Sequence, residues 1–171
     1  MRPKNVADYA EVISAVAVVI SLFYLGYQVK QNTDAVRAVA LNSVASDINT
    51  LFIKGLEKEI AIILLKSEKN TETLSDVEKE QLFNWFGLNV SIFEAAWRHK
   101  ANRRITEEYF DTMIPIICST YQSKAGLEFW FVWKDAVTQG YWHEVTQRCD
   151  FKKPDLSSPF YPKDTHQPVQ N

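Results

Sequence analysis

The stretch VISAVAVVISLFYLGYQV, residues 12–29, determines how the rest of this sequence is interpreted. It holds eighteen uncharged, mostly apolar residues between Glu11 and Lys30. An α-helix of this length rises about 27 Å, which is close to the roughly 30 Å hydrocarbon thickness of a bilayer. Tyrosines stand near both ends, where amphipathic rings settle at the level of the headgroups. The stretch therefore predicts a transmembrane helix over residues 9–30.

Two other interpretations of this stretch stay open, a cleaved signal peptide and a buried helix of a soluble domain. A signal peptide fits less well because Asp8 and Glu11 would lie in its normally basic n-region. No small-x-small cleavage site follows Gly26 either. A soluble helix fits less well because an apolar run of this length is unusual in a soluble core. The composition favours an uncleaved anchor.

The charges that flank the span leave its orientation open. Arg2 and Lys4 precede it, while Lys30 and Arg37 follow it, so the positive-inside rule favours neither orientation. A short N-terminal tail with two acids and two bases is easily moved across a membrane. On that ground we expect the N-terminus outside and the domain that follows in the cytoplasm.

Length and composition bound the remainder of the chain. After the span, about 120 of the 171 residues are left, enough for one domain with a single core. A net charge of −2 gives no general attraction to nucleic acid, which makes such a partner unlikely. Five glycines and few alternating patterns argue against a β fold. Cys118 and Cys149 could form one bond, although so few cysteines favour a reducing compartment.

These patterns predict an all-α protein, in which one transmembrane helix continues into a compact helical bundle. No Gly or Pro interrupts the chain between Gly26 and Gly55, and apolar residues from Val36 to Phe52 recur at helical spacing, which predicts a core-facing stripe that ends at Phe52. The expected segments are an N-terminal tail, the transmembrane helix, the bundle and a proline-rich disordered tail, at residues 1–8, 9–30, 31–150 and 151–171.

Several signals place helix ends within the bundle. Gly55 ends the first helix, a shorter helix is expected over residues 56–66, and residues 67–73 read as a loop. Ser75 and Glu78 form a capping box that starts a long helix to about Asn102. Its apolar face is the expected centre of the core and consists of Leu82, Phe83, Phe86, Val90, Phe93 and Trp97.

The last part of the bundle contains shorter helical patterns. Thr106 starts a helix that Pro115 should kink or break, and residues 124–126 read as a short connection. LEFWFVWKDAV and TQGYWHEVTQRC then form one interrupted helix or two short ones. FWFVW at 129–133 is apolar on every side of a helix, so burial, a protein interface and contact with the bilayer are all open for it.

Three stretches of this chain together resemble a family of small bacterial proteins of uncharacterised function. They are AVVISLFYLGYQVKQNTDAVRA, IFEAAWRHKANRRITEEYF and GLEFWFVWKDAV, and the resemblance covers roughly residues 9–148. The resemblance implies one N-terminal span, a C-terminal helical domain and a bacterial inner-membrane location. It implies no activity and supplies no site residues.

Three residues are candidates for chemistry. Asp47 and Glu94 fall at or beside core-facing helical positions, and His143 is followed by an acid. A buried acid needs a partner and is sometimes catalytic. A structural role is the stronger interpretation, because Glu94 can pair with Arg98 one turn later and Asp47 can meet a basic residue or the wet edge of the bundle. No spacing typical of a metal, cofactor or nucleotide site occurs, so none of these groups is expected.

A basic cluster closes the long helix, at Arg98, Lys100, Arg103 and Arg104. Three interpretations are open for it: a solvated helix end, contact with phospholipid headgroups, or an acidic protein or nucleic-acid partner.

The function expected from these observations is a membrane-tethered interaction or regulatory module. Its partners are the bilayer and a protein or a second copy, because Ala10 with Ser14 and Ala17 with Ser21 would let two spans approach closely. No catalytic signature is present, so a non-enzymatic role is favoured. The alternative is a membrane-anchored enzyme that uses acidic residues in a helical cleft.

Overall fold

The computed structural model describes residues 4–152, and their side chains from residue 8 onward. All the secondary-structure elements assigned in that range are helical, which confirms the all-α prediction. The chain forms two units, which meet between Leu41 and Asn42. Apart from Phe151 and Lys152, the tail expected at residues 151–171 lies outside the described range.

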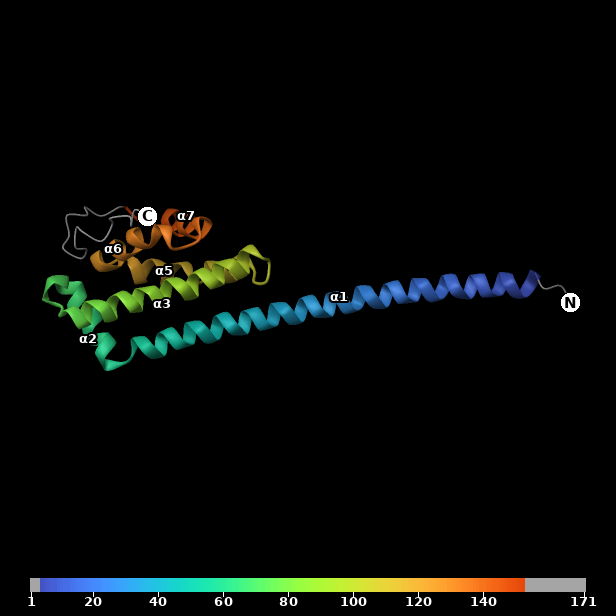
Figure 1. Ribbon diagram of the computed structural model, residues 1–171, viewed down its shortest axis with the longest axis horizontal. Coiled ribbons are helices and arrows are strands. Elements are labelled where there is room, and N and C mark those ends of the chain that lie inside the picture. Colours follow the sequence, from blue (N-terminus) through green and yellow to red (C-terminus); the bar gives the residue numbers. More distant parts are fainter. Residues whose placement is uncertain (1–3, 153–171) are drawn as a thin grey trace, which may run out of the picture. The chain divides into compact units, whose positions relative to one another are not determined.

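The first unit consists of the N-terminal part of α1, a helix that runs from Lys4 to Gly55 without a break (Figure 1). The helix starts inside the segment that we expected to be a tail. In the apolar stretch 12–29 all side chains are exposed, with Phe23 at 77%. Among the described helices, α1 is the one whose length and composition would allow it to cross a membrane.

The second unit contains the last turns of α1 and all later helices. Their bounds are α2 Lys58–Lys69, η1 Thr71–Thr73, α3 Asp76–Ala101, α4 Glu107–Asp111, α5 Ile114–Tyr121, α6 Lys124–Val132, η2 Trp133–Asp135 and α7 Gln139–Arg148. Figure 1 shows α5, α6 and α7 gathered on one side of α3. Contacts join α3 to α2, α4, α5 and α6, so α3 is the central helix of the domain.

The predicted capping box begins α3. The Glu78 N–H donates to Ser75 Oγ at 3.3 Å, and Glu78 Oε2 accepts from the Ser75 N–H at 2.9 Å. The apolar face of α3 forms the core as expected, since four of its six residues are at most 3% exposed and two are half-buried. The buried four are Leu82, Phe86, Val90 and Phe93.

The helix expected from Thr106 is broken near Pro115, as the sequence predicted, because α4 ends at Asp111 and α5 begins at Ile114. Thr106 begins α4 by accepting a hydrogen bond from the Tyr109 N–H at 3.1 Å. Pro115 lies in the first turn of α5, where a missing N–H costs nothing because that donor has no partner inside the helix. The fixed φ of proline therefore starts α5 after α4 has ended.

The structure differs from the expected loops in two places. Residues 67–73 include the last turn of α2 and the short helix η1. Residues 124–126, expected to be a connection, form the first turn of α6, because Ser123 Oγ accepts a hydrogen bond from the Gly126 N–H at 3.0 Å. The glycine at this position serves packing: a Cβ here would lie 2.7 Å from the Cα of Tyr121.

The FWFVW segment is mostly covered within the domain. Phe129 and Trp130 are 3% and 1% exposed, while Phe131 and Trp133 are half-buried. Phe129 stacks on Tyr121 and Trp133, and the Trp130 Nε1–H donates to Thr146 Oγ1 at 2.9 Å. Burial is thus the main role of this segment.

Candidate functional site

Glu94, one of the three predicted candidates, links α3 to the start of α7 and so has a structural role. Its Oε1 accepts hydrogen bonds from Arg98 at 2.7 Å and from the Thr138 N–H at 2.9 Å, and it also accepts from the Thr138 hydroxyl. Burial by itself would raise the pKa of Glu94, but these hydrogen bonds outweigh burial and lower it below its usual value. A carboxylate held in this way caps α7 and has little freedom to act as an acid or base.

Asp47 and His143 do not join Glu94 in one site. Asp47 is half-buried on the last turns of α1 and forms no ion pair or side-chain hydrogen bond with the described residues. His143 is exposed on α7, with its ring 5.1 Å from that of Trp142. Across residues 4–152, no group of three or more His, Cys, Asp or Glu is arranged to hold a metal ion.

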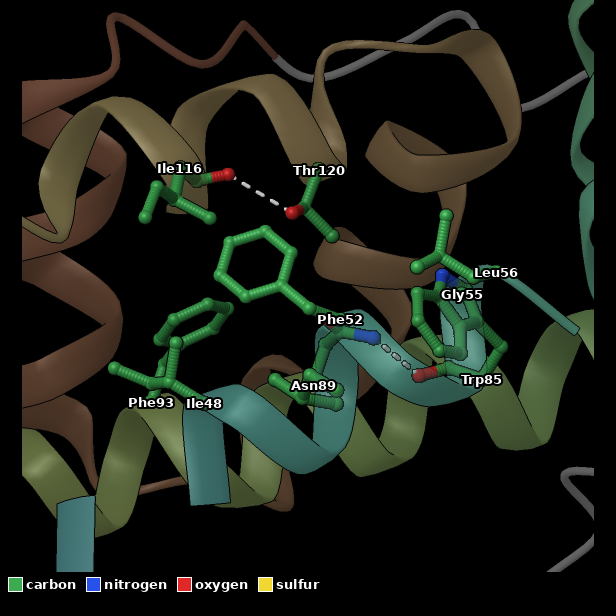
Figure 2. Close-up of a pocket in the computed structure, with 10 residues that line it drawn as sticks. Ile48, Phe52, Gly55, Leu56, Trp85, Asn89, Phe93, Ile116 and Thr120 are labelled. Atoms are coloured by element: carbon green, nitrogen blue, oxygen red, sulfur yellow. Dashed lines mark hydrogen bonds between the residues drawn. The ribbon is translucent and has the colours of Figure 1, made fainter. Parts of the chain in front are cut away.

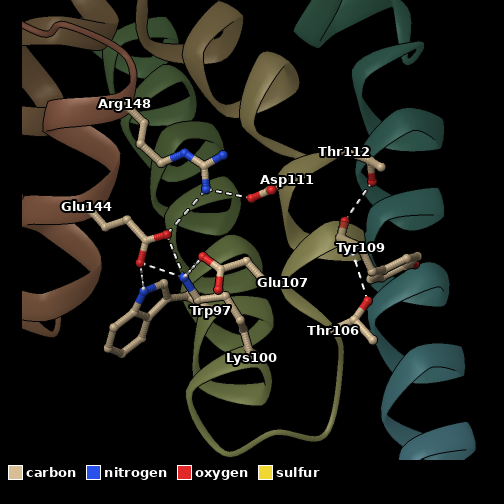
Figure 3. Close-up of polar contacts among 9 residues, drawn as sticks. All are labelled: Trp97, Lys100, Thr106, Glu107, Tyr109, Asp111, Thr112, Glu144 and Arg148. Carbon is tan, nitrogen blue, oxygen red and sulfur yellow. Dashed lines mark hydrogen bonds and ion pairs between the residues drawn. The ribbon is translucent and has the colours of Figure 1, made fainter.

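A polar network joins α3, α4 and α7 (Figure 3). Glu144 Oε2 accepts from the Trp97 Nε1–H at 2.8 Å, and both its oxygens accept from Lys100 Nζ at 2.5 and 2.7 Å. Burial would raise the pKa of Glu144, but the bonds from Lys100 and Trp97 lower it overall. Arg148 extends the network by donating to Asp111 at 2.6 Å. The network fastens α7 to the rest of the domain.

These contacts hold two of the four residues in the basic cluster predicted at the end of α3 in ion pairs. Arg98 pairs with Glu94, and Lys100 pairs with Glu144 while its Nζ lies 4.9 Å from the centre of the Phe110 ring. Only Arg103 and Arg104 stay exposed and outside any ion pair among the described residues. Two exposed charges are a small patch, which fits a solvated helix end better than a binding surface.

Glu128 is a buried acid that the sequence reasoning missed. It lies on α6 and is 2% exposed, and neither carboxylate oxygen has a hydrogen-bond partner within the described part of the chain. Its neighbours Phe129 and Trp130 signalled a buried helix, yet no helical pattern marked the acid itself. An unpaired buried carboxylate costs stability, so Glu128 is a strained feature of this domain.

An apolar pocket lies between the last turns of α1, the middle of α3 and α5 (Figure 2). Its volume is about 320 Å³. The lining residues are Ile48, Leu51, Phe52, Gly55, Leu56, Trp85, Asn89, Phe93, Ile116 and Thr120. Largely apolar pockets with a few polar groups are the usual form of binding sites, and this volume is near the lower end of their range.

Two polar side chains contribute to the pocket wall. Asn89 is 3% exposed and donates one hydrogen bond to the Trp85 carbonyl at 2.8 Å, which leaves one amide donor unused by the described residues. Thr120 Oγ1 donates to the Ile116 carbonyl at 2.8 Å and keeps its acceptor capacity. The wall thus offers an amide donor of Asn89 and the hydroxyl acceptor of Thr120 in an apolar surrounding, where each would fix the orientation of a bound group.

Exposed apolar side chains stand at and beside the pocket. Phe52 and Leu56 line it and are 55% and 83% exposed, and Ile53 next to them is 61% exposed. Ile62 and Leu65 on α2 are exposed as well, at 40% and 60%. Five large apolar side chains are thus exposed within fourteen residues of sequence, and two of them, Phe52 and Leu56, line the pocket.

The sequence reasoning missed the pocket for a physical reason. It placed Phe52 in the core-facing stripe of the first helix and Leu56 in the next helix, whereas both contribute to an open wall. The polar side chain of Asn89, on the otherwise apolar face of α3, was the available signal. Comparison with known proteins gives no further guidance, because no family model, curated protein or solved structure matches this chain.

Proposed function

We propose that this protein is a membrane-tethered interaction module that binds an apolar segment of a partner protein in the pocket between α1, α3 and α5. The observation that carries the proposal is the pocket with its exposed rim, Phe52 and Leu56. Aromatic and aliphatic anchors that fill such pockets supply most of the binding energy in protein interfaces. In this proposal the span holds the domain at a membrane, and the resemblance in sequence suggests a bacterial inner membrane.

The chemistry of α1 supports the tether. The apolar stretch carries no charge, and its serines hide their hydroxyl groups within the helix: Ser14 donates to the Ala10 carbonyl and Ser21 to the Ala17 carbonyl, each at 2.8 Å. A helix in lipid must satisfy its polar groups internally, as these do. The exposed apolar side chains of residues 12–29 would be costly in water and favourable in a bilayer.

The extent of the exposed apolar surface favours a protein as the partner. A small ligand is mostly enclosed by its site, but Leu56 and Ile53 are more than half exposed beside the pocket. A helix or loop that inserts one side chain into the pocket would also cover these neighbours. The unused amide donor of Asn89 could then bind a carbonyl of the inserted segment.

The alternative, a membrane-anchored enzyme that uses acidic residues, has weaker support. The carboxylate of Glu94 is taken up by Thr138 and Arg98, and that of Glu144 by Lys100 and Trp97. Neither acid lines the pocket. An interaction role needs no further assumption about these groups.

Site-specific photo-cross-linking in native membranes tests the proposal. A photoreactive residue placed at position 56 of the full-length protein should give a discrete cross-linked product. The same residue at Val77, which is apolar and 69% exposed but does not line the pocket, should give none.

A pocket-filling change makes the test specific. Thr120→Phe would place a ring in the pocket and should abolish the product from position 56 without lowering the melting temperature. Ser119→Phe, at the exposed neighbouring position on α5, is the matched control and should leave the product intact. Cross-linking that is equal at positions 56 and 77, or that survives Thr120→Phe, would refute the pocket as the binding site.

A further inference from the structure

The two cysteines of the chain are joined to each other. Cys118 on α5 and Cys149 at the end of α7 form a disulfide, with their Cα atoms 5.3 Å apart. The sequence contains no other cysteine, so no thiol is left free. The bond that the sequence allowed therefore links α5 to the end of α7 through two cysteines that are 31 residues apart in sequence.

The disulfide adds to several noncovalent attachments of α7. Glu94 holds the first turn of α7 through Thr138, and Glu144 and Thr146 are held by hydrogen bonds from tryptophans. At the last turn the only ion pairs of the described residues are those of Arg148, whose side chain is 32% exposed. Exposed pairs contribute little, so the disulfide adds a covalent attachment to the packing of Val145, which is 0% exposed, at the C-terminal end of α7.

The position of the bond is typical of a structural disulfide. Catalytic and regulatory pairs are commonly close in sequence, as in Cys-x-x-Cys, and one of their thiols is activated by nearby positive charge. Here the cysteines are far apart in sequence and join two packed helices. Structural disulfides form and persist in oxidising compartments and are rare in the cytosol.

We infer that the helical domain lies on the oxidising side of the membrane, with the N-terminus on the cytosolic side, so that the partner of the pocket is an exported or extracytoplasmic protein. The inference rests on the tether of the proposed function. A single crossing separates the residues before position 12 from the domain. The flanking basic residues permit this orientation, since two precede the span and two follow it closely. It is the reverse of the cytoplasmic placement expected from the sequence.

The first experiment determines whether Cys118 and Cys149 of the unmodified protein are free thiols or are joined by a disulfide. Cells that express the full-length chain are quenched with acid, and the protein is alkylated under denaturing conditions with a polyethylene glycol maleimide. We expect no shift on a gel without reductant and a shift by two adducts after reduction. Cys118→Ser, which leaves Cys149 alone, is the control and should shift by one adduct without reductant. Two adducts on the unreduced wild type would overturn the inference.

The second experiment determines on which side of the membrane the helical domain and the N-terminus lie. Lys124→Cys, at an exposed position, is introduced into a chain in which Cys118 and Cys149 are serine. A membrane-impermeant maleimide should label it in intact spheroplasts of a bacterial host, whereas Asn5→Cys in the same background should react only after permeabilisation. The reverse pattern would overturn the inference.

Alkaline carbonate extraction separates this inference from the tether. If the protein stays in the membrane but its thiols are free, the inference fails and the tether stands. If the protein is extracted from membranes, the tether fails, and with it the assignment of sides. The thiol assay uses the unmodified chain, so it gives a result even where the double serine variant folds poorly.

Discussion

Thr138 donates two hydrogen bonds, from its backbone N–H and from its hydroxyl group, to the same carboxylate oxygen of Glu94, which lies 44 residues earlier in the chain. A side chain of α3 thus determines where α7 begins. The bonds also explain how an acid that is only 8% exposed stays charged, because each donor replaces a hydrogen bond to water.

Replacing Glu94 by Gln should lower the free energy of unfolding by about 2 kcal/mol, since hydrogen bonds to a charged group are worth more than neutral ones. Denaturant unfolding of the detergent-solubilised full-length protein measures this. Glu80→Gln is the control, because Glu80 is exposed on the same helix and accepts only one long bond, from Asn84 at 3.3 Å. Its effect should stay within about 0.5 kcal/mol. An equal effect of both changes would contradict the tie.

Two glycines should respond in opposite directions to replacement by alanine. At Gly126 a Cβ would lie 2.7 Å from the backbone of Tyr121, so Gly126→Ala should destabilise by about 1–3 kcal/mol. At Gly87, inside α3, the nearest atom would be 3.8 Å away, which is ordinary contact. Gly87→Ala should therefore stabilise by about 0.5–1 kcal/mol through the lower entropy of the unfolded chain. Melting temperatures of the two variants check the pair, and a shared sign would refute the packing argument.

Features that depend on neighbouring residues could be predicted from the sequence. The capping box at Ser75, the cap at Thr106 and the end of α1 at Gly55 depend on hydrogen bonds and backbone preferences within one turn. The buried face of α3 follows from helical periodicity alone. The pairing of Glu94 with Arg98 is also local, and it was predicted.

Features that depend on tertiary packing could not be predicted. The partner of Glu94 on α7 requires knowledge of which helices meet, and so does the formation of the Cys118–Cys149 bond, which the sequence allowed but did not establish. The first turn of α6 was taken for a connection because glycine usually marks one, whereas Gly126 is needed where two segments touch. The pocket arises from a lack of side-chain volume between three helices, which no single helix pattern records.

Glu78 should make stability depend on pH in the acidic range. The hydrogen bond from Lys66 Nζ at 2.6 Å, together with the Ser75 N–H, lowers the pKa of Glu78 to about 2 from 4.5. Because the folded pKa is the lower one, this stabilisation is fully present above pH 4.5 and is lost as the pH falls towards 2. The melting temperature of Glu78→Gln should therefore lie below that of the wild type at pH 7, and the difference should shrink across this window.

Lys66→Met is the control for the pH dependence. Without the Lys66 charge the pKa of Glu78 in the folded protein should rise towards its ordinary value, so the acid-dependent loss should still begin near pH 4.5 but should be smaller and end at a higher pH. A difference between wild type and Glu78→Gln that stays constant from pH 7 to pH 2 would show that the ion pair with Lys66 is absent in solution.

Glu128 and Glu94 are both buried glutamates, yet replacing each by methionine should change stability in opposite directions. Glu128 is 2% exposed and its oxygens have no partner within the described residues, so its burial is uncompensated. Glu128→Met keeps the length of the side chain, removes the two unpartnered oxygens and should raise the free energy of unfolding by about 1–3 kcal/mol. Glu94→Met removes a satisfied carboxylate, leaves the Thr138 N–H without its partner and should lower the free energy of unfolding by about 2–4 kcal/mol. Denaturant unfolding of both variants beside the wild type decides the matter, because a destabilising Glu128→Met would mean that this carboxylate is bonded as Glu94 is.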